Sequence, residues 1–304
     1  MFYKKKFKRL GKIINSDLAV NYPFRLFYRL LKVLFLIITE KTVIFKVNAK
    51  KTTFKFIYKP YKSFGFGGRG QFVYREYYDR FFRVDLDIFK KQFKTFLDIG
   101  CSRGFFTTYI AKAYNCQTLS VDVFNYAIKD CKENLELNNI NKAILECSAV
   151  GSQEDSGKKI LLNKDISPST TSVITSKKID TYATNSVVMV SIDELCFRHR
   201  LNSIDLIKID VEGYEYEVLE GSLNSIKKYR PIIYLEFNFT RKRLEILNLF
   251  MEISYKPLIP LRDGSLTLLK EKDLQNIKYP NHNIFSIPDE NYQEVLKNPK
   301  NIIV

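Results

Sequence analysis

The chain has 304 residues, of which 45% are hydrophobic and 27% charged, enough for one large domain with an appendage. Its net charge of +16 is uneven, because residues 1–60 hold fifteen Lys/Arg and two acidic residues and therefore carry +13. Five scattered cysteines without a C-x-x-C pair and two distant histidines argue against a disulfide framework and a zinc site, so a reducing, cytoplasmic compartment is expected.

The basic character belongs to an N-terminal arm. Its most apolar run, "LLKVLFLII" at 30–38, contains a lysine and is shorter than the roughly 20 residues of a membrane span. A partly buried amphipathic helix is the simplest interpretation, and a helix lying on a membrane surface is the alternative. Residues 1–60 are therefore a candidate contact for an anionic membrane surface or for nucleic acid. The oligomeric state stays open.

The next segment predicts a β-hairpin followed by a flexible junction. Residues 42–58 alternate apolar and polar positions on both sides of "NAKK", which is typical of a hairpin. "GFGGRG" at 65–70 then interrupts the pattern, and a helix is expected over 74–92. We place a domain boundary here, with the arm and hairpin at 1–69 and the main domain at 70–304.

From residue 95 the pattern alternates between apolar strands and amphipathic helices. This alternation predicts an α/β fold with a mostly parallel sheet covered on both faces. The expected strands are 95–99, 118–123, 143–147, 204–210 and 231–237, and the expected helices are 105–114, 126–137 and one after Gly213.

Three segments depart from this alternation. Residues 166–186 contain ten Ser/Thr without a helical stripe, which predicts a long loop or irregular hairpin. Ser191 and Glu194 form a capping box that starts a short helix. The Asp263-Gly264 turn predicts an antiparallel hairpin at the C-terminal edge of the sheet.

The turn after the first strand has a D-x-G-x-x-x-G pattern. Gly100 lets the backbone approach a ligand, and Gly104 lets the next helix start tightly. Ser102 stands where a dinucleotide site has its middle glycine, and Asp98 would repel a pyrophosphate. An acid there suits a ligand with a positive group, such as S-adenosyl-L-methionine. Asp122, at the end of the second strand, can accept hydrogen bonds from ribose hydroxyls. The set predicts a class I methyltransferase fold, which is Rossmann-like.

Several carboxylates follow the strand at 204–210 and its neighbour. Asp210 ends the first of these strands, Glu212 lies in the turn, and Glu215 opens the next helix, where an acid complements the helix dipole. Glu236 ends the strand at 231–237. A carboxylate at such a strand end can remove the proton of a hydroxyl that is being methylated. Asp210, Glu212 and Glu236 are the candidate catalytic residues, and Asp210 is also a candidate cofactor contact.

Three stretches resemble the FkbM family of S-adenosyl-L-methionine-dependent methyltransferases. They are "LDIGCSRGFFT" at 97–107, "VSIDELCFRHRLNSIDLIKIDVEGYEYEVLEGS" at 190–222, and "RPIIYLEFN" at 230–238, with weaker similarity at Asn134, Asn138 and "SAVGS" at 148–152. The resemblance implies an O-methyltransferase acting on a sugar, a glycan or a related small molecule; no metal ligands are predicted, and metal dependence stays open. The cofactor residues it implies, together with those above, are Asp98, Gly100, Cys101, Ser102, Gly104, Phe105, Asp122, Val123, Ser148, Ala149 and Asp210.

Two alternatives of other classes stay open. In an RNA ribose 2'-O-methyltransferase, the basic arm would grip phosphates, and its aromatic residues would stack on bases. A non-catalytic binding module would keep the fold without turnover. In the enzyme, Tyr214 and the loop at 166–186 are candidates to close over the acceptor.

Overall fold

A computed structural model provides the structure of the chain. It describes residues 42–49, 51–58, 84, 86–89, 91–162, 185–237, 242–261, 263–271, 274, 283–297 and 302–303. Several predictions lie outside the described residues: the arm before residue 42, the junction at 65–70, the domain boundary between 69 and 70, and the loop from 166 to 184.

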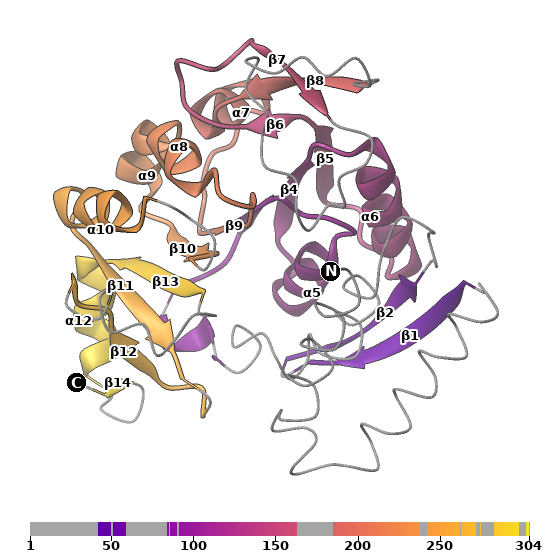
Figure 1. Cartoon of the computed structure of the whole chain (residues 1–304). Helices are drawn as coiled ribbons and strands as arrows, with labels where there is room; N and C mark the ends of the chain where they lie inside the picture. Colours follow the sequence, from indigo (N-terminus) through magenta and orange to yellow (C-terminus); the bar gives the residue numbers. More distant parts are fainter. Residues whose placement is uncertain are drawn as a thin grey trace, which may run out of the picture.

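A mostly parallel sheet forms the centre of the molecule. Within the described residues it has nine strands, in the order β14-β12-β11-β13-β10-β9-β3-β4-β5 (Figure 1). The strands are β3 (Thr95–Ile99), β4 (Gln117–Asp122), β5 (Ala143–Cys147), β9 (Leu206–Ile209), β10 (Ile232–Leu235), β11 (Tyr255–Pro260), β12 (Leu266–Leu268), β13 (Ile284–Pro288) and β14 (Ile302–Ile303). The five from β5 to β10 run parallel, whereas β13 is antiparallel to both β10 and β11. The predicted fold class is confirmed.

The predicted elements of this sheet agree closely with the structure. The strands at 95–99 and 143–147 and the helix at 105–114 have the expected bounds. The Asp263-Gly264 turn connects β11 to β12, which pair antiparallel as predicted. The outermost strand is β14, however, which pairs parallel to β12 and covers that side of the hairpin.

The helix expected over 74–92 is wrong where the structure describes it. Residues Leu86–Phe89 form a short 3-10 helix, η2, and residues 91–93 are irregular. The carboxylate of Asp205 holds the chain just before and at the start of β3. Its Oδ2 atom accepts hydrogen bonds from the backbone N–H groups of Lys94 and Thr95 at 2.8 and 2.9 Å. These contacts turn the chain into β3 instead of another helical turn.

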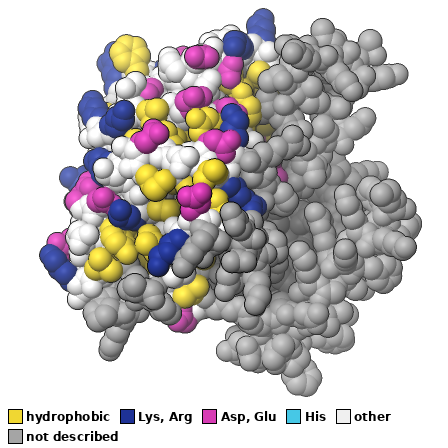
Figure 2. Space-filling view, turned by 60° about the vertical axis from the view of Figure 1, so that its left-hand side comes forward, with side chains coloured by type: hydrophobic (Ala, Val, Ile, Leu, Met, Phe, Trp, Pro, Cys, Tyr) yellow, Lys and Arg dark blue, Asp and Glu magenta, His cyan; other side chains and the backbone are white. Residues whose placement is uncertain are grey.

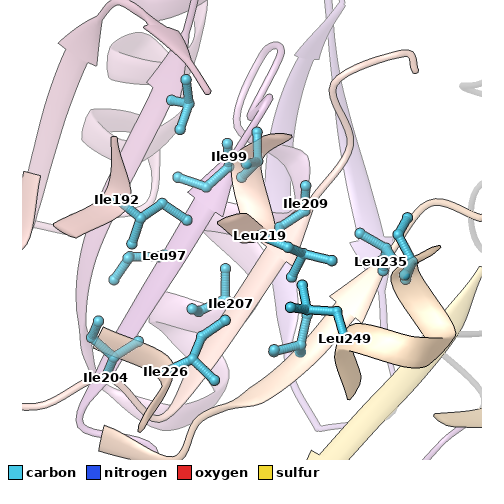
Figure 3. Packing of buried hydrophobic residues seen from close by; sticks show 14 of the residues in the cluster. Leu97, Ile99, Ile192, Ile204, Ile207, Ile209, Leu219, Ile226, Leu235 and Leu249 are labelled. Atoms are coloured by element: carbon cyan, nitrogen blue, oxygen red, sulfur yellow. The ribbon is translucent and has the colours of Figure 1, made fainter. Parts of the chain in front are cut away.

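Helices cover both faces of the sheet. On one face lie α7 (Ile192–Arg198), α8 (Glu215–Glu220), α9 (Leu223–Tyr229) and α10 (Arg243–Glu252). Their side chains pack against alternate residues of the strands, including Leu97, Ile207 and Leu235, in an apolar core (Figure 3). On the other face lie α5 (Phe105–Tyr114), α6 (Asn125–Leu137) and α12 (Asp289–Leu296). The side chain of Ser191 accepts a hydrogen bond from Glu194 N–H, so the predicted cap of α7 is confirmed.

A smaller sheet lies beside α7. It has the order β6-β8-β7, formed by β6 (Ala149–Val150), β8 (Asn185–Val190) and β7 (Lys159–Leu162) (Figure 1). β8 is parallel to β6 and antiparallel to β7. The last two residues of the loop predicted at 166–186 therefore belong to a strand, because Asn185 and Ser186 pair with Leu162 and Leu161.

The predicted N-terminal hairpin is confirmed and packs on the main body. It consists of β1 (Val43–Asn48) and β2 (Thr53–Tyr58), which pair antiparallel. Phe54 and Phe56 are buried, and their rings meet the ring of Phe105 edge-on, with centroids 5.3 and 5.2 Å apart. The hairpin therefore completes the core on the α5 face of the sheet.

The described surface mixes charges of both signs. Figure 2 shows Lys and Arg side chains interspersed with Asp and Glu over the face that it presents. This mixture agrees with the net charge of only +3 outside residues 1–60. In the part of the chain that the structure describes, no helix has the length and apolar character needed to cross a membrane.

The position of the hairpin yields a prediction about truncation. Deleting residues 1–40 should leave the protein folded, because Phe54 and Phe56 stay in place. Deleting residues 1–60 should lower the free energy of unfolding by at least about 3 kcal/mol, since two buried phenylalanines are lost. Urea unfolding measures both effects.

The shorter deletion should also weaken binding to anionic vesicles or RNA in a salt-dependent way. Aggregation of the 1–40 deletion would show that the arm belongs to the core.

Candidate functional site

Four neighbouring parallel strands bring the predicted site residues to one edge of the sheet. The turn 100–104 follows β3, Asp122 ends β4, Asp210 follows β9, and Glu236 follows β10. These strands are adjacent in the order β10-β9-β3-β4, so their carboxyl ends meet. In doubly wound sheets this edge is where ligands bind.

The backbone of the turn after β3 is held tightly against its neighbours. The N–H groups of Gly100 and Cys101 both donate to the carbonyl oxygen of Val121, at 2.9 and 3.0 Å. Gly100 has a φ of +75°, and a Cβ atom there would lie 1.9 Å from the carbonyl oxygen of Asp210. At Gly104 a Cβ atom would lie 2.2 Å from the Sγ of Cys131. Only glycine fits either position. At Gly100 the close approach is to the backbone of Asp210, whereas the sequence suggested an approach to a ligand.

Asp122 is fixed beside this turn by two backbone amides. Ser102 N–H donates to its Oδ2 atom at 2.8 Å, and Phe124 N–H donates to its Oδ1 atom at 3.0 Å. Burial raises the pKa of Asp122 to about 6, although the two amides favour the charged form. Each carboxylate oxygen keeps a second acceptor position, which can receive a ribose hydroxyl.

Two predicted cofactor residues point their side chains elsewhere. The Cys101 thiol is buried and forms a hydrogen bond with Cys131. This hydrogen bond and burial raise the pKa of Cys101. The ring of Phe105 packs against the rings of Phe54 and Phe56 of the hairpin. Any contribution of Cys101 or Phe105 to a ligand must come from the backbone. Spacing along the sequence did not reveal these side-chain directions.

The remaining cofactor candidates line the end of β4 and β5. Ser148 N–H donates to the carbonyl oxygen of Asp122 at 3.1 Å, so it lies directly beside the acid. Val123 and Ala149 belong to an apolar cluster with Met189 and Ile160. Ala149 is buried in this cluster, so of the two apolar candidates only Val123 is partly exposed.

A buried lysine, Lys208, connects the turn to the catalytic candidates. It is 3% exposed, and its Nζ atom lies 3.1 Å from Asp210 Oδ2 and 3.5 Å from Asp98 Oδ1. It also donates to the carbonyl oxygen of Gly100 at 3.3 Å and lies 5.1 Å above the ring of Phe106. Asp98 was expected to face the positive group of a ligand. The structure instead buries it completely and pairs it with the chain's own lysine.

Sequence reasoning missed the role of Lys208. The available signal was its position, because it interrupts the apolar run Ile207–Ile209 of a strand expected to be buried on both faces. A lysine in such a strand needs a buried counter-charge. Register supplies it, since Lys208 pairs directly with Asp98 across β3 and β9.

The three predicted catalytic carboxylates converge. One oxygen each of Asp210, Glu212 and Glu236 lies within 4.8 Å of the others, which is close enough to hold a single cation. Burial raises the pKa of Glu236 far above its ordinary value, and the charge of Asp210 and a hydrogen bond to it add to the effect. A proton retained on Glu236 removes one of the three negative charges, so it lowers the repulsion among the carboxylates without a bound cation.

Glu215 and Tyr214 have mainly local roles. Glu215 is fully buried and accepts a hydrogen bond from Gly213 N–H at 2.9 Å, so it supports the start of α8. Burial raises its pKa. The hydroxyl of Tyr214, a candidate to cover the acceptor, donates to Asp155 at 2.9 Å. That bond holds Tyr214 toward the turn at 151–158.

The comparison with protein families matches this site directly. The model of the methyltransferase FkbM domain matches residues 98–256, just over half of the chain. The chain belongs to the FkbM methyltransferase family. The match begins at Asp98 and contains every carboxylate discussed above. No curated protein matches the chain significantly.

Solved methyltransferases have similar folds. A methyltransferase FkbM from Methylobacillus flagellatus KT has 12% identity and a TM-score of 0.43, covering 64% of this chain and 44% of that one. A Streptococcus mutans protein in complex with SAH has 11% identity and a TM-score of 0.40, covering 66% and 92%. An rRNA methylase from Streptococcus thermophilus has 8% identity and a TM-score of 0.38, covering 66% and 91%. This chain thus spans less than half of the similar FkbM protein.

S-adenosyl-L-methionine is the cofactor of this methyltransferase domain. The residues present fit it. Gly100 and Gly104 let the turn pack closely against Asp210 and Cys131, and Asp122 beside the turn offers two fixed carboxylate oxygens. Asp122, the backbone of the turn and Ser148 are the groups placed to hold it.

The pKa of Asp122 makes cofactor binding depend on pH. Ribose hydroxyls donate to the carboxylate, so binding favours the ionised form. Affinity for S-adenosylhomocysteine should therefore fall as pH drops below about 6, by up to about tenfold per pH unit. Asp122→Asn should weaken binding by about 1–3 kcal/mol and remove this dependence. Calorimetry from pH 5 to 8 tests both, and a variant as pH-dependent as the natural protein would place the ribose site elsewhere.

The pairing of Lys208 with Asp98 can be tested by stability. Lys208→Met should lower the free energy of unfolding by about 3–5 kcal/mol, because it leaves Asp98 buried without its counter-charge. The double variant Asp98→Asn/Lys208→Met removes both charges and should recover most of that loss. Urea unfolding measures the cycle. Equal stability of the single and double variants would show that the loss arises from packing.

Proposed function

We propose that the chain is an S-adenosyl-L-methionine-dependent O-methyltransferase that acts on a hydroxyl of a sugar, a glycan or a related small molecule. The observation that carries the proposal is the position of Asp210. Its carboxylate lies between the Lys208 ammonium and the Glu236 carboxyl, at the end of β9, and its side chain is 27% exposed. An acceptor hydroxyl can reach it there.

The two neighbours of Asp210 prepare it to act as a base. Lys208, 3.1 Å away, favours its charged form. Glu236 is more deeply buried and keeps its proton, so it can donate a hydrogen bond to Asp210 without competing for the substrate's proton. The pair thus divides into one protonated and one ionised carboxyl, a common arrangement for acid–base work.

The chain's own residues have a limited chemical task. When bound, S-adenosyl-L-methionine supplies an electrophilic methyl group. The protein must hold the acceptor hydroxyl beside Asp210, accept its proton on the Asp210 carboxylate, and exclude water. Glu212, whose backbone has a φ of +56°, lies close enough to bind a second hydroxyl of the acceptor.

The charge of the crevice supports a neutral acceptor over RNA. Asp210 and Glu212 face it as carboxylates, and the nearby Lys208 is already shared with Asp98. A phosphate beside the reacting hydroxyl would be repelled by these acids. Any contact with nucleic acid or an anionic membrane would have to come from the basic residues 1–60, which carry +13.

A pair of isosteric variants tests the assignment of the base. Asp210→Asn should lower kcat by about 10²-fold or more, since the amide cannot accept the proton. Glu236→Gln should keep most of the activity, because glutamine can donate the hydrogen bond of a protonated glutamate. Methyl transfer from labelled cofactor to a panel of glycosides and to capped RNA provides the assay.

Affinity for S-adenosylhomocysteine serves as the control and should stay near that of the natural protein in both variants. An inactive Glu236→Gln together with an active Asp210→Asn would reverse the roles of the two residues. Transfer to capped RNA but to none of the glycosides would favour the ribose methyltransferase. Binding of the cofactor without methyl transfer to any of the glycosides or to capped RNA would favour a binding module.

A further inference from the structure

Two asparagines of α6 hold the free edge of the N-terminal hairpin. Asn138 accepts a hydrogen bond from Lys55 N–H at 2.8 Å and donates to the carbonyl oxygen of Lys55 at 2.6 Å. Asn134 accepts a hydrogen bond from Ile57 N–H at 2.7 Å. Figure 1 shows β2 running beside α6. The spacing matches, because four residues of helix and two residues of strand both advance by about 6 Å.

Asn134 also binds the turn that faces the cofactor. Its Nδ2 group donates to the carbonyl oxygen of Arg103 at 3.0 Å and to that of Asp130 at 3.0 Å. The Nδ2 group of Asn138 instead donates to the carbonyl oxygen of Lys55 and to that of Asn134 at 2.7 Å. Both side chains are buried. The two asparagines thus differ in what their amide groups bind: Asn134 donates to the turn at Arg103, whereas Asn138 donates to the hairpin at Lys55 and also accepts from Lys112 Nζ at 3.4 Å.

Other contacts place the hairpin close to the same turn. Phe105, the first residue of α5, packs on Phe54 and Phe56 of β2. The turn itself rests on α6, where Arg103 Nε lies 3.5 Å from Asp130 Oδ2. The hairpin therefore contacts Phe105 directly and is connected to Arg103 through Asn134, and these are the two neighbours of Gly104.

We propose that the β1–β2 hairpin is part of the cofactor-binding apparatus and that Asn134 is the positioning residue that connects it to the turn 100–104. Asn134 receives the β2 backbone on its oxygen and holds the carbonyl of Arg103 with its amide, so a docked hairpin keeps the turn in its ligand-ready shape. This inference rests on the cofactor site used in the proposed function. It extends the site to residues before the segment that matches the family.

Matched aspartate variants separate the contact with the turn from the contact with the hairpin. Asn134→Asp keeps an acceptor for Ile57 N–H but loses the donor to Arg103. Asn138→Asp makes the same change one helical turn away. It removes the side-chain donor to the carbonyl oxygens of Lys55 in the hairpin and Asn134 in α6, and leaves the contact with the turn in place. Asn134→Asp should raise the Kd for S-adenosylhomocysteine about tenfold or more, and Asn138→Asp should change it less than about twofold. Calorimetry on the full chain gives both values.

Proline variants test the connection from the strand side. The outward N–H groups of Lys55 and Ile57 bond to α6 and not to β1, so proline removes each of them while sparing the ladder with β1. Ile57→Pro should raise the same Kd, and Lys55→Pro should leave it near that of the natural protein. These variants preserve the test if Asn134→Asp fails to fold.

Hydrogen exchange of the cofactor-free protein gives a readout that does not depend on ligand or activity. Amides of residues 100–108 should exchange faster in Asn134→Asp and Ile57→Pro than in Asn138→Asp and Lys55→Pro. Equal exchange and equal Kd in all four variants, with similar losses of Tm, would overturn the proposal and leave the hairpin a purely structural element. Should the natural protein not bind S-adenosylhomocysteine, the cofactor site fails while the exchange comparison still tests the connection.

Discussion

The burial of one lysine sets the geometry of the whole site. Lys208 lies inside the sheet, so its charge requires partners that are themselves buried and charged. Asp98 supplies one from the neighbouring strand, and Asp210 supplies the other from the end of its own strand. Thr107 adds a hydrogen bond to Asp98 at 2.6 Å and thereby ties α5 to the same group. A shift of register between β3 and β9 would separate these charges, so the cofactor turn and the catalytic candidate keep one fixed relation.

This arrangement also explains how several acids can share one edge of the sheet. Ionised carboxylates at such distances repel one another strongly when water is excluded. Each of these carboxyl groups is stabilised in a different way. Asp210 has the lysine, Glu236 retains its proton, and Glu215 accepts a hydrogen bond from Gly213 at the start of α8. Asp210, whose side chain is 27% exposed, is then left to meet a substrate at this edge of the sheet.

Much of the fold could be predicted from the sequence, and the reasons lie in particular residues. Parallel strands buried on both faces read as apolar runs, and Gly100, Gly104 and Asp122 occur at the spacing that a ligand turn requires. The missing parts depend on contacts between distant residues. The link from Lys208 to Asp98 requires the register of β3 and β9, and the bond from Asn138 to Lys55 spans 83 positions. The directions of Cys101 and Phe105 were equally hidden, because they depend on what packs outside the turn.

Elements at both ends of the described body dock onto the family segment, and polar side chains of that segment take part at each end. At the N-terminal side, Asn134 and Asn138 bond to the backbone groups that the edge strand β2 would otherwise leave unpaired. At the C-terminal side, Arg230 donates to the carbonyl oxygens of Ile253 and Ser254, at the end of α10, and pairs with Glu290 of α12. A side chain can satisfy a backbone group wherever helix and strand spacing coincide, without a further strand. The C-terminal elements also join the segment by strand pairing of β13 with β10, and the hairpin also joins it by packing of Phe54 and Phe56. Among these polar contacts, that of Asn134 also reaches the cofactor turn, at Arg103.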